Sequence, residues 1–467
     1  MAKSLREYIA SMESQLSGAL LRIERPVSPQ HEVSALLEKA RREKRGAAVY
    51  FSSIEGSDLP VVGNLITSRA CSCLALGLEP GADRLEYMRA LRKKLEANLP
   101  PVQVQTGPVQ AVKKTGKEAD LSVLPLLTHT DGDESPSLLM GAAVARNPRS
   151  GAVTVSLPQL RWLDKDALGI FADEDLPLAN CISDTSDERQ PIEVALVIGM
   201  HPAFYLAAAV GMDGAVSLGR IGSLLGEPLS VTRTLTGDLP VPAHAEIVIE
   251  GTVSRGDAKT LRAPASPIGY EGREREALVF QVKALTRRDN AIFQTAGLFG
   301  ERLFLPTPIR EAEALITLQR AVPAVLDVRI PVASNGYHAY VKVDQKRMGE
   351  AKKAIVAALG TIPGVKTVFA VDTDIDMDVD REVLWVLATR VVADRDLFMV
   401  AGVLGDSEDP SSYEITRRGR GRMVTRLGID ATTPIGLPYE IPRPTHVPGT
   451  EGVKLDEYLE DWTDGTA

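Results

Sequence analysis

Residues 153–164, "VTVSLPQLRWLD", are the stretch from which the fold of this chain is best worked out. The first part has the composition of a buried strand, and Pro158 breaks that strand because proline has no backbone N–H to donate. After the break, Arg161 stands beside Trp162. Two interpretations are open. The guanidinium either binds a carboxylate ligand or only reaches toward solvent at the end of a strand.

The sequence around this stretch, residues 109–306, is rich in short strand-like runs. Examples are "SLLMGAAVARN", "IEVALVIGM", "AEIVIEGTVS" and "ALVFQVKALTRRD". Only short helical segments such as "HPAFYLAAAV" interrupt them. This pattern predicts an antiparallel barrel or sandwich with helical decorations.

The flanking segments have the alternating helix and strand patterns of α/β domains. We expect an N-terminal α/β domain over 1–108, a connecting helix over 307–325 and a C-terminal α/β domain over 326–447. The tail, residues 448–467, is acidic. It is either a frayed solvated end or an arm on a neighbouring subunit, of which we favour the arm.

Composition narrows the classes of function. The 467 residues are 44% hydrophobic and 25% charged, with a formal net charge of -9. These values are typical of a globular protein and disfavour nucleic acid as a partner. No apolar run approaches the roughly 18 residues that cross a bilayer, and no secretory signal is visible. We therefore expect no membrane partner and a cytoplasmic location.

Two further features are candidate ligand sites. His129 and His201 have no partner histidine or cysteine at metal-binding spacing, so we expect both to be structural. A glycine-bearing loop over 417–426 concentrates arginines and could bind an anion, although a surface loop or subunit contact is the simpler interpretation. Its arginines are Arg417, Arg418, Arg420, Arg422 and Arg426.

A collinear set of segments gives the strongest indication of family. It includes "GSDLPVVGNL", "LDKDALGI", "PIEVALVIGMHPAFYLAAA", "LLGEPL", "VDTDIDMDVDREVLWVLATRV" and "LGIDATTP". In order and spacing this set resembles the UbiD family of decarboxylases nearly from end to end. The resemblance implies an α/β fold with an N-terminal α/β domain, a central split β-barrel flavin-binding domain and a C-terminal α/β oligomerisation domain.

The resemblance also implies a cofactor and a site. Family members use prenylated FMN, whose modified ring acts as an electron sink while carbon dioxide leaves. A divalent metal and potassium join its phosphate to the protein. An arginine and two glutamates surround the carboxylate that is lost, because an anion must be held and a proton delivered.

Carrying the family's residues over to this chain reveals departures. Thr154 falls at the asparagine metal ligand, Gln159 at the catalytic arginine, and Arg161 where glutamine is usual. Either the last two have exchanged roles on one face of the strand, or a register shift makes Arg161 the catalytic arginine. We expect Arg161 to clamp the substrate, with Gln159, Thr154 and Ser156 lining the cavity.

Further family positions are also altered. Pro177 stands at the metal-binding histidine, after Asp173, Glu174 and Asp175. Ser217 or Gly219 stands at the metal-binding glutamate, and Leu261 and Ser266 stand at the two catalytic glutamates. Arg426 matches a lysine that reaches toward the cofactor. The metal is therefore in doubt and the proton donor unassigned, although Glu271, Glu274 and Glu276 follow in the next segment.

Together these observations predict a UbiD-like carboxy-lyase that acts non-oxidatively on an aromatic or α,β-unsaturated carboxylic acid. The expected cofactor is prenylated FMN or FMN. A homodimer or higher homo-oligomer is expected, with a related second subunit as an option. Two alternatives stay open: a non-catalytic partner subunit of a hetero-oligomeric decarboxylase, and a different flavin-dependent reaction.

Overall fold

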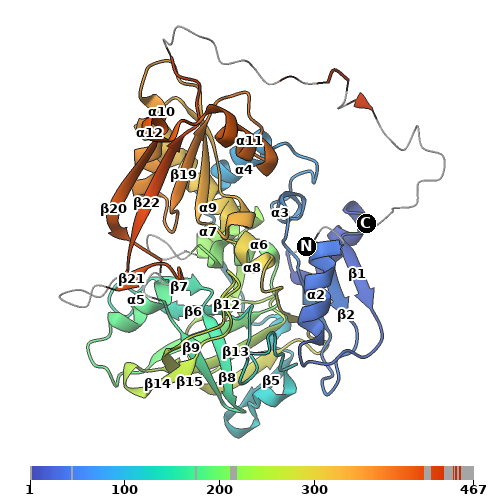
Figure 1. Ribbon diagram of the computed structural model, residues 1–467. Helices are drawn as coiled ribbons and strands as arrows, with labels where there is room; N and C mark the ends of the chain where they lie inside the picture. The colour runs from blue at the N-terminus through green and yellow to red at the C-terminus, as the bar shows by residue number, and fades with distance from the viewer. Residues whose placement is uncertain are drawn as a thin grey trace.

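The computed structural model describes residues 3–43, 46–173, 176–210, 218–406, 408–414 and 422–435, and in the tail 445, 447–449 and 452–453. Several residues singled out above lie outside this part: Glu174, Asp175, Ser217, Arg417, Arg418, Arg420 and most of 448–467. The described chain forms two α/β units around a curved antiparallel sheet, as the sequence predicts (Figure 1).

The N-terminal unit is a small α/β layer. Its elements are α1 (Leu5–Gln15), β1 (Leu20–Ile23), α2 (Glu32–Glu43), β2 (Ala48–Phe51), β3 (Val61–Gly63), α3 (Arg69–Ala75) and α4 (Arg84–Glu96). A capping box of Ser4 and Glu7 begins α1. The sheet order is β1-β2-β3-β16, and β16 (Phe293–Gln294) comes from the far end of the predicted middle domain. The domain boundary at residue 306 therefore stays a prediction.

The middle of the chain forms a nine-stranded sheet. Its strands are β5 (Val112–Thr115), β6 (Ala142–Arg146), β7 (Val153–Ser156), β8 (Gln159–Asp164), β9 (Ala167–Phe171), β10 (Ile192–Ile198), β13 (Ile247–Val253), β14 (Ala258–Arg262) and β15 (Glu274–Arg287). The main path runs β7-β6-β10-β13-β15-β9-β8. Leu157 and Pro158 alone connect β7 to β8. Because that link joins the two ends of the path, the sheet must curl until its edges approach each other.

A smaller sheet and short helices complete this middle unit. The sheet contains β4 (Val102–Gln103), β11 (Ser230–Arg233) and β12 (Pro240–Pro242). The helices are α5 (Pro177–Ser183), α6 (Pro202–Ala208) and α7 (Leu218–Leu225). His201 caps α6 by accepting a hydrogen bond at Nδ1 from the backbone N–H of Ala203, and it is buried, as expected of a structural histidine.

The C-terminal unit is a six-stranded sheet in the order β17-β18-β19-β22-β20, with β21 paired to β22. Its strands are β17 (Val325–Arg329), β18 (His338–Val343), β19 (Thr367–Val371), β20 (Leu397–Leu404), β21 (Tyr413–Glu414) and β22 (Arg422–Asp430). Its helices are α10 (Glu350–Thr361), α11 (Asp380–Arg390) and α12 (Ala393–Asp396). The connection from the barrel runs through α8 (Glu301–Phe304) and α9 (Thr307–Ala321).

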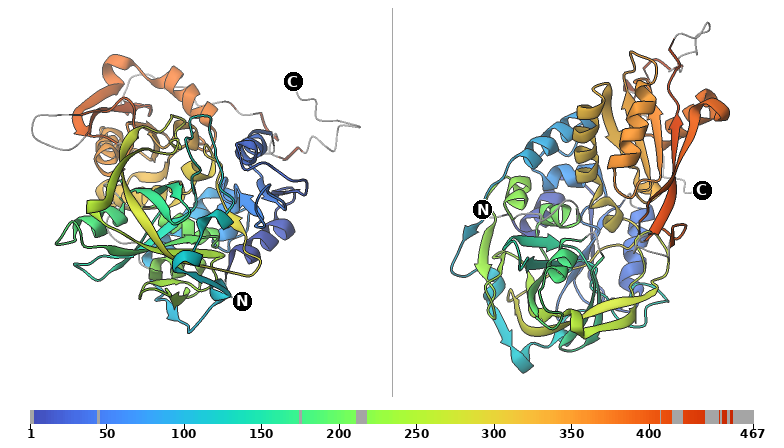
Figure 2. Two further views of the ribbon diagram at one scale, coloured as in Figure 1. Left: turned by 90° about the horizontal axis from the view of Figure 1, so that it is seen from below. Right: turned by 90° about the vertical axis from the view of Figure 1, so that its left-hand side faces the viewer.

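The N-terminal unit and the barrel share their hydrophobic cores. One core joins α1, α3 and α4 to β6, β7, β10 and α6, and a second joins α2 and β2 to β8, β9 and β15. The C-terminal sheet has separate cores around α10 and α11. The views in Figure 2 show the blue N-terminal unit against the green barrel, with the orange C-terminal unit stacked on one side.

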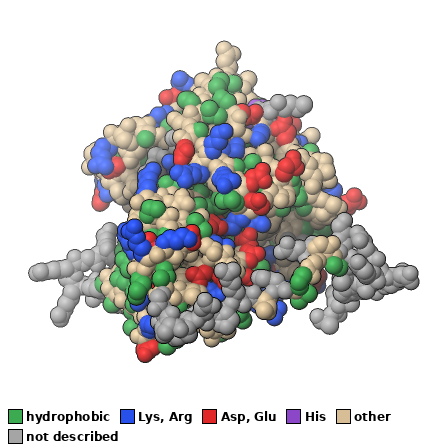
Figure 3. Space-filling model, turned by 90° about the horizontal axis from the view of Figure 1, so that it is seen from above, with side chains coloured by type: hydrophobic (Ala, Val, Ile, Leu, Met, Phe, Trp, Pro, Cys, Tyr) green, Lys and Arg blue, Asp and Glu red, His purple; other side chains and the backbone are tan. Residues whose placement is uncertain are grey.

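Polar contacts tie the C-terminal unit to the rest. Arg84 of α4 binds Asp327 at 2.6 Å and Glu311 at 3.2 Å. Basic and acidic side chains lie next to each other across the middle of the face in Figure 3. No described helix combines the length and apolarity that a membrane span requires.

Candidate functional site

The break at Pro158 positions four buried polar residues on two strands. Thr154 and Ser156 lie on β7, and Gln159 and Arg161 lie on β8. β7 and β8 form the two edges of the curled sheet, which the two-residue link at Leu157 and Pro158 brings close together. The sequence therefore predicts which residues are buried here, but their partners come from elsewhere in the chain.

Arg161 forms a buried ion pair with Asp133. Its Nη2 lies 3.2 Å from Asp133 Oδ1, and the exposed fractions of the two side chains are 3% and 2%. Nη2 also donates to the Ala263 carbonyl at 3.1 Å, and Nη1 donates to the Ser135 carbonyl at 3.3 Å. Burial lowers the pKa of Arg161, and Asp133 opposes this effect. Nε is the one nitrogen without a hydrogen-bond partner among the described residues.

Asp133 also fixes the loop that leads into it. Its Oδ2 accepts hydrogen bonds from the backbone N–H groups of His129 and Thr130, at 2.8 and 2.9 Å. The His129 ring is buried against Ser34 and the Ser137 carbonyl, and burial lowers its pKa to about 4. Arg161, Asp133 and His129 therefore form a buried cluster in which His129 is structural, and Arg302 is an electrostatic neighbour of the His129 ring.

A second arginine, Arg275, lies at the open end of the same sheet. Ladder register explains its position: Gln159 pairs with Phe171, and Leu278 pairs with Ile170, so Arg275 comes level with Asp173. Its Nη1 lies 2.5 Å from Asp173 Oδ1, and its guanidinium lies 5.2 Å from the centre of the Phe171 ring. Nε has no partner among the described residues.

Gln159 connects Arg275 to the C-terminal unit. Its Oε1 accepts from Arg275 Nη2 at 3.4 Å, and its Nε2 donates to Glu408 Oε1 at 3.4 Å. Glu408 belongs to the loop after β20. Gln159 therefore does lie at a meeting point of charged groups, but the cation beside it is Arg275 and not Arg161.

Arg302 of α8 is the second cation of this cluster. Burial lowers its pKa, while the nearby carboxylates of Glu408 and Asp173 oppose this effect. Its Nη1 is buried and has no hydrogen-bond partner in the described part of the chain. We call Arg275, Arg302, Asp173, Glu408 and Gln159 the seam cluster, because it lies where the barrel meets the C-terminal unit.

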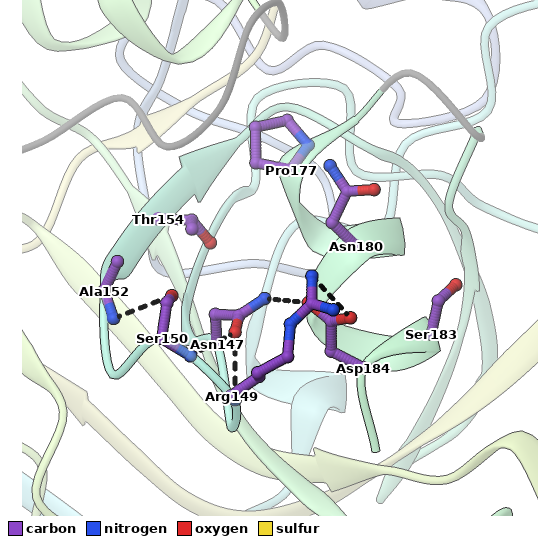
Figure 4. Close-up of a pocket in the computed structure, with 9 residues that line it drawn as sticks. All are labelled: Asn147, Arg149, Ser150, Ala152, Thr154, Pro177, Asn180, Ser183 and Asp184. Carbon is purple, nitrogen blue, oxygen red and sulfur yellow. Dashed lines mark hydrogen bonds and ion pairs between the residues drawn. The ribbon is translucent and has the colours of Figure 1, made fainter. Parts of the chain in front are cut away.

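A pocket of about 380 Å³ lies beside β7. The turn between β6 and β7 and helix α5 form its walls (Figure 4). Asn147 Nδ2 donates to Asp184 Oδ2 at 2.8 Å, and Arg149 Nη2 lies 3.2 Å from Asp184 Oδ1. Thr154 and Pro177, the residues at two of the family's metal positions, both line this pocket.

The donors around the pocket suit a phosphate better than a divalent metal. Arg149, Asn180, Ser150 and Ser183 can donate to phosphate oxygens. A volume in this range is typical of a small-molecule site, for which about 300–1,000 Å³ is usual. No group of three histidine, cysteine, aspartate or glutamate side chains arranged for a metal occurs within the described residues. The pocket therefore offers several donors to a phosphate, next to the Asp184 carboxylate that pairs with Arg149.

The remaining predicted residues are not gathered at one site. Ser156 Oγ accepts from the Leu178 backbone N–H at 3.1 Å, so it holds the start of α5. Thr154 Oγ1 donates to the Ala145 carbonyl at 3.4 Å. Arg426 lies on β22, where it donates to the Leu359 and Leu404 carbonyls inside the C-terminal unit. Its expected role near the cofactor stays a prediction.

The sequence interpretation missed the functional candidates on β15 and beyond. It considered Glu271, Glu274 and Glu276, but all three are exposed in the structure. Arg275 instead points inward, because neighbouring residues of a strand face opposite sides. It pairs directly with Leu261, one of the two positions where a catalytic glutamate was expected.

Comparisons with known proteins cover nearly the whole chain. Family models match at residues 13–93, 101–301 and 304–431, described as the N-terminal, Rift-related and C-terminal domains of 3-octaprenyl-4-hydroxybenzoate carboxy-lyase. An uncharacterized protein in the cooM 5' region of Rhodospirillum rubrum is 30% identical over 424 residues, 89% of each chain.

Two solved structures show the same fold. The UbiD-class enzyme HmfF from Pelotomaculum thermopropionicum, in complex with FMN, has a TM-score of 0.89 and 32% identity, over 98% of this chain and 100% of that one. The 3,4-dihydroxybenzoic acid decarboxylase of Klebsiella pneumoniae has a TM-score of 0.86 and 25% identity, with the same coverage.

Proposed function

Because the chain belongs to the UbiD family, we propose that it is a carboxy-lyase that removes carbon dioxide non-oxidatively from an aromatic or α,β-unsaturated carboxylic acid. Its active site is rebuilt around the seam cluster. The observation that carries this proposal is Arg275, an inward-facing arginine with an unpartnered Nε beside buried Gln159. It restores a cation close to the position where Gln159 replaces the family's arginine.

Arg275 and Arg302 bind the carboxylate of the substrate. Both guanidinium groups have an N–H that no described residue accepts, and such groups favour a carboxylate ligand. Phe171 lies beneath Arg275 and limits its movement. From the sequence alone this role is expected of Arg161, which would first have to lose its ion pair with Asp133. A variant of Arg275, described below, tests one assignment against the other.

The charges of the seam cluster indicate how a proton is supplied. Two arginines balance two carboxylates, so a bound substrate carboxylate adds one uncompensated negative charge. We assign the supply of the proton to Glu408, because its described side-chain hydrogen bond is with neutral Gln159, whereas Asp173 is paired with Arg275.

Glu408 is therefore the proton donor of the proposed reaction. The bond between the substrate carbon and its carboxyl group breaks, carbon dioxide leaves, and the electron pair stays with the organic fragment. The proton from Glu408 then replaces carbon dioxide on that carbon. Glu408 takes up a new proton when the next acid binds.

Thr154 and the donors of the pocket beside β7 would hold the phosphate of a bound flavin, and no step is assigned to a divalent metal or potassium. When bound, prenylated FMN supplies an electron sink for the carbanion that loss of carbon dioxide leaves behind.

The test is co-expression with a flavin prenyltransferase. We expect a flavin absorbance spectrum in the purified protein and carbon dioxide release from at least one of 3,4-dihydroxybenzoate, 4-hydroxybenzoate and cinnamate. Glu408→Gln should lower turnover on the order of 100-fold, as expected when a general acid is removed. A colourless protein that turns over none of these acids would contradict the proposal. Activity that requires a second related chain would favour the partner-subunit alternative.

A further inference from the structure

A second pocket, of about 270 Å³, lies on the N-terminal unit, and none of its described lining residues lines the pocket beside β7. Its walls come from α1 and from the end of α3 with the turn that follows. Both α1 and α6 contact α3 (Figure 1). Glu7, Ser11 and Gln15 recur at intervals of four residues, so one face of α1 carries all three. We call this cavity the α1 pocket.

His201 lines the α1 pocket although its exposed fraction is only 4%. Its Nδ1 accepts a hydrogen bond from the Ala203 backbone N–H at 3.3 Å, and its ring packs edge-to-face against Tyr8, with 5.3 Å between ring centres. A neutral imidazole that accepts at Nδ1 carries its proton on Nε2. No described residue accepts from that Nε2–H, so the pocket contains a fixed hydrogen-bond donor without a partner in the described chain.

The surroundings of His201 keep the ring neutral. Burial, together with the charges of Lys3 and Lys94, lowers the pKa of His201 to about 3. At pH 7 the ring therefore donates a hydrogen bond to a ligand without carrying a charge of its own.

Lys3 provides a second donor to the α1 pocket, and this one is charged. Burial lowers the pKa of its ammonium, whereas Glu227 and Glu7 oppose this effect. No described carboxylate forms an ion pair with its Nζ. A side chain on Gly77 would begin 3.5 Å from Nζ, so the glycine leaves that side of the ammonium open. An ammonium and a neutral N–H that line one pocket favour a carboxylate ligand.

The α1 pocket also contains two carboxylates. Glu7 accepts a hydrogen bond from the Ser4 backbone N–H at 3.0 Å, and Glu79 is exposed and forms no ion pair with a described residue. A ligand with only negative charge would meet two carboxylates for one ammonium. A ligand with only positive charge would leave the donors of Lys3 and His201 without a partner. A molecule with one carboxylate and one ammonium satisfies both sets of groups.

The size and the apolar lining of the α1 pocket narrow the ligand further. Its volume lies below the roughly 300–1,000 Å³ that is usual for drug-sized ligands, so the molecule is small. Leu74, Leu78 and the Tyr8 ring form the apolar part of the lining. These three side chains can cover a short hydrocarbon group.

We propose that the α1 pocket binds a small α-amino acid with an apolar side chain. Its carboxylate lies on Lys3 and the Nε2–H of His201, and its ammonium lies beside Glu7 and Glu79. The hydrocarbon side chain packs against the two leucines. This site is independent of the proposed carboxy-lyase activity, because none of its described lining residues belongs to the seam cluster.

Calorimetric titration of the full chain with L-leucine tests this proposal. Leucine should bind with a Kd on the order of 1 mM or tighter. Two analogues of the same skeleton, 4-methylpentanoate without the ammonium and L-leucinamide without the carboxylate, should each bind at least about 10-fold more weakly. No saturable binding of leucine, or equal affinity for either analogue, would overturn the proposal. These titrations use the unaltered protein, so they do not depend on the folding of a variant.

Variants then locate the bound leucine. Lys3→Met and His201→Asn should each raise its Kd at least about 10-fold. Asparagine still caps α6 but is too short to replace the Nε2–H. The matched control is Lys93→Met, an exposed lysine of α4 outside the pocket, which should leave the Kd unchanged. Arg275→Ala should also leave it unchanged. Loss of leucine binding in Arg275→Ala, or an unchanged Kd in both pocket variants, would overturn the proposal.

Discussion

Arg161 and Arg275 lie on strands that are separated only by β9, yet their surroundings differ. Arg161 is sealed, which here means buried with protein partners at both terminal nitrogens. Asp133, Ala263 and Ser135 accept hydrogen bonds from these nitrogens, and almost none of the ion pair is exposed. Arg275 also has a carboxylate partner, Asp173, but its side chain is 28% exposed and its Nε is unpartnered.

This difference in surroundings distinguishes an arginine that stabilises the fold from an arginine that can bind a ligand. An arginine whose partners all come from the protein holds those partners in place, and removing one leaves a buried charge. An arginine at an open seam with an unused N–H can accept a ligand without breaking the fold. In this chain Arg161 holds the 129–135 loop, and Arg275 is the available cation.

The largest expected effect comes from removing the sealed partner. Asp133→Ala leaves Arg161 buried without a counter-charge, so we expect the free energy of unfolding to fall by about 3–5 kcal/mol. The matched variant Asp173→Ala acts on the open pair and should cost less than about 1 kcal/mol. Urea unfolding followed by circular dichroism measures both. If the free energy of unfolding fell equally in the two variants, the buried Arg161–Asp133 pair and the open Arg275–Asp173 pair would not differ as we describe.

Arg275→Ala should separate activity from stability. We expect kcat/KM to fall on the order of 100-fold, because one preorganised donor to the substrate carboxylate is lost. The melting temperature should change little. Arg273→Ala is the control, since Arg273 is exposed two residues earlier on the same chain segment. Full turnover by Arg275→Ala in flavin-loaded protein would return the clamp role to Arg161.

The sealed cluster should also make stability depend on pH through His129. Burial lowers the pKa of this imidazole from 6.5 to about 4, so the unfolded chain takes up the proton first as the pH falls. Stability is therefore retained above pH 6.5 and lost progressively toward pH 4, by roughly 2–3 kcal/mol. Chemical unfolding of wild type and His129→Gln between pH 7 and 4 checks this. The two curves should converge as the pH falls; a constant gap would contradict the assignment.

Chelation should have the smallest effect. Since the proposal assigns the flavin phosphate to the pocket donors, dialysis against EDTA should leave the amount of bound flavin unchanged. Flavin absorbance and metal analysis before and after dialysis provide the measurement. Loss of flavin that added manganese restores would show that a metal holds the phosphate after all.

Local sequence patterns predicted much of the fold. The strand-like runs at 192–198 and 247–253 and the short helical segment at 202–208 correspond to β10, β13 and α6. Each of these elements buries a continuous apolar face, so the pattern of apolar residues within the element is enough to predict it. The return of β16 to the N-terminal sheet was not predicted, because pairing with β3 is decided by contacts more than 200 residues apart in sequence.

The site was predicted less well for the same physical reason. The sequence identifies Arg161 and Gln159 as buried polar residues, but Arg161 meets Asp133 and Gln159 meets Arg275 and Glu408 only through strand register and unit packing. The run "REREAL" did contain a signal. In a strand, Glu274 and Glu276 share one face and Arg275 the other, so one of the two sets had to turn inward.

The most direct test of the account is the crystal structure of the flavin-loaded protein with a slowly converted aromatic acid bound. We predict that the carboxylate of the acid lies within hydrogen-bonding distance of Arg275 and Arg302, with the Arg161 to Asp133 ion pair intact. A carboxylate bound to Arg161, with Asp133 displaced, would contradict the account.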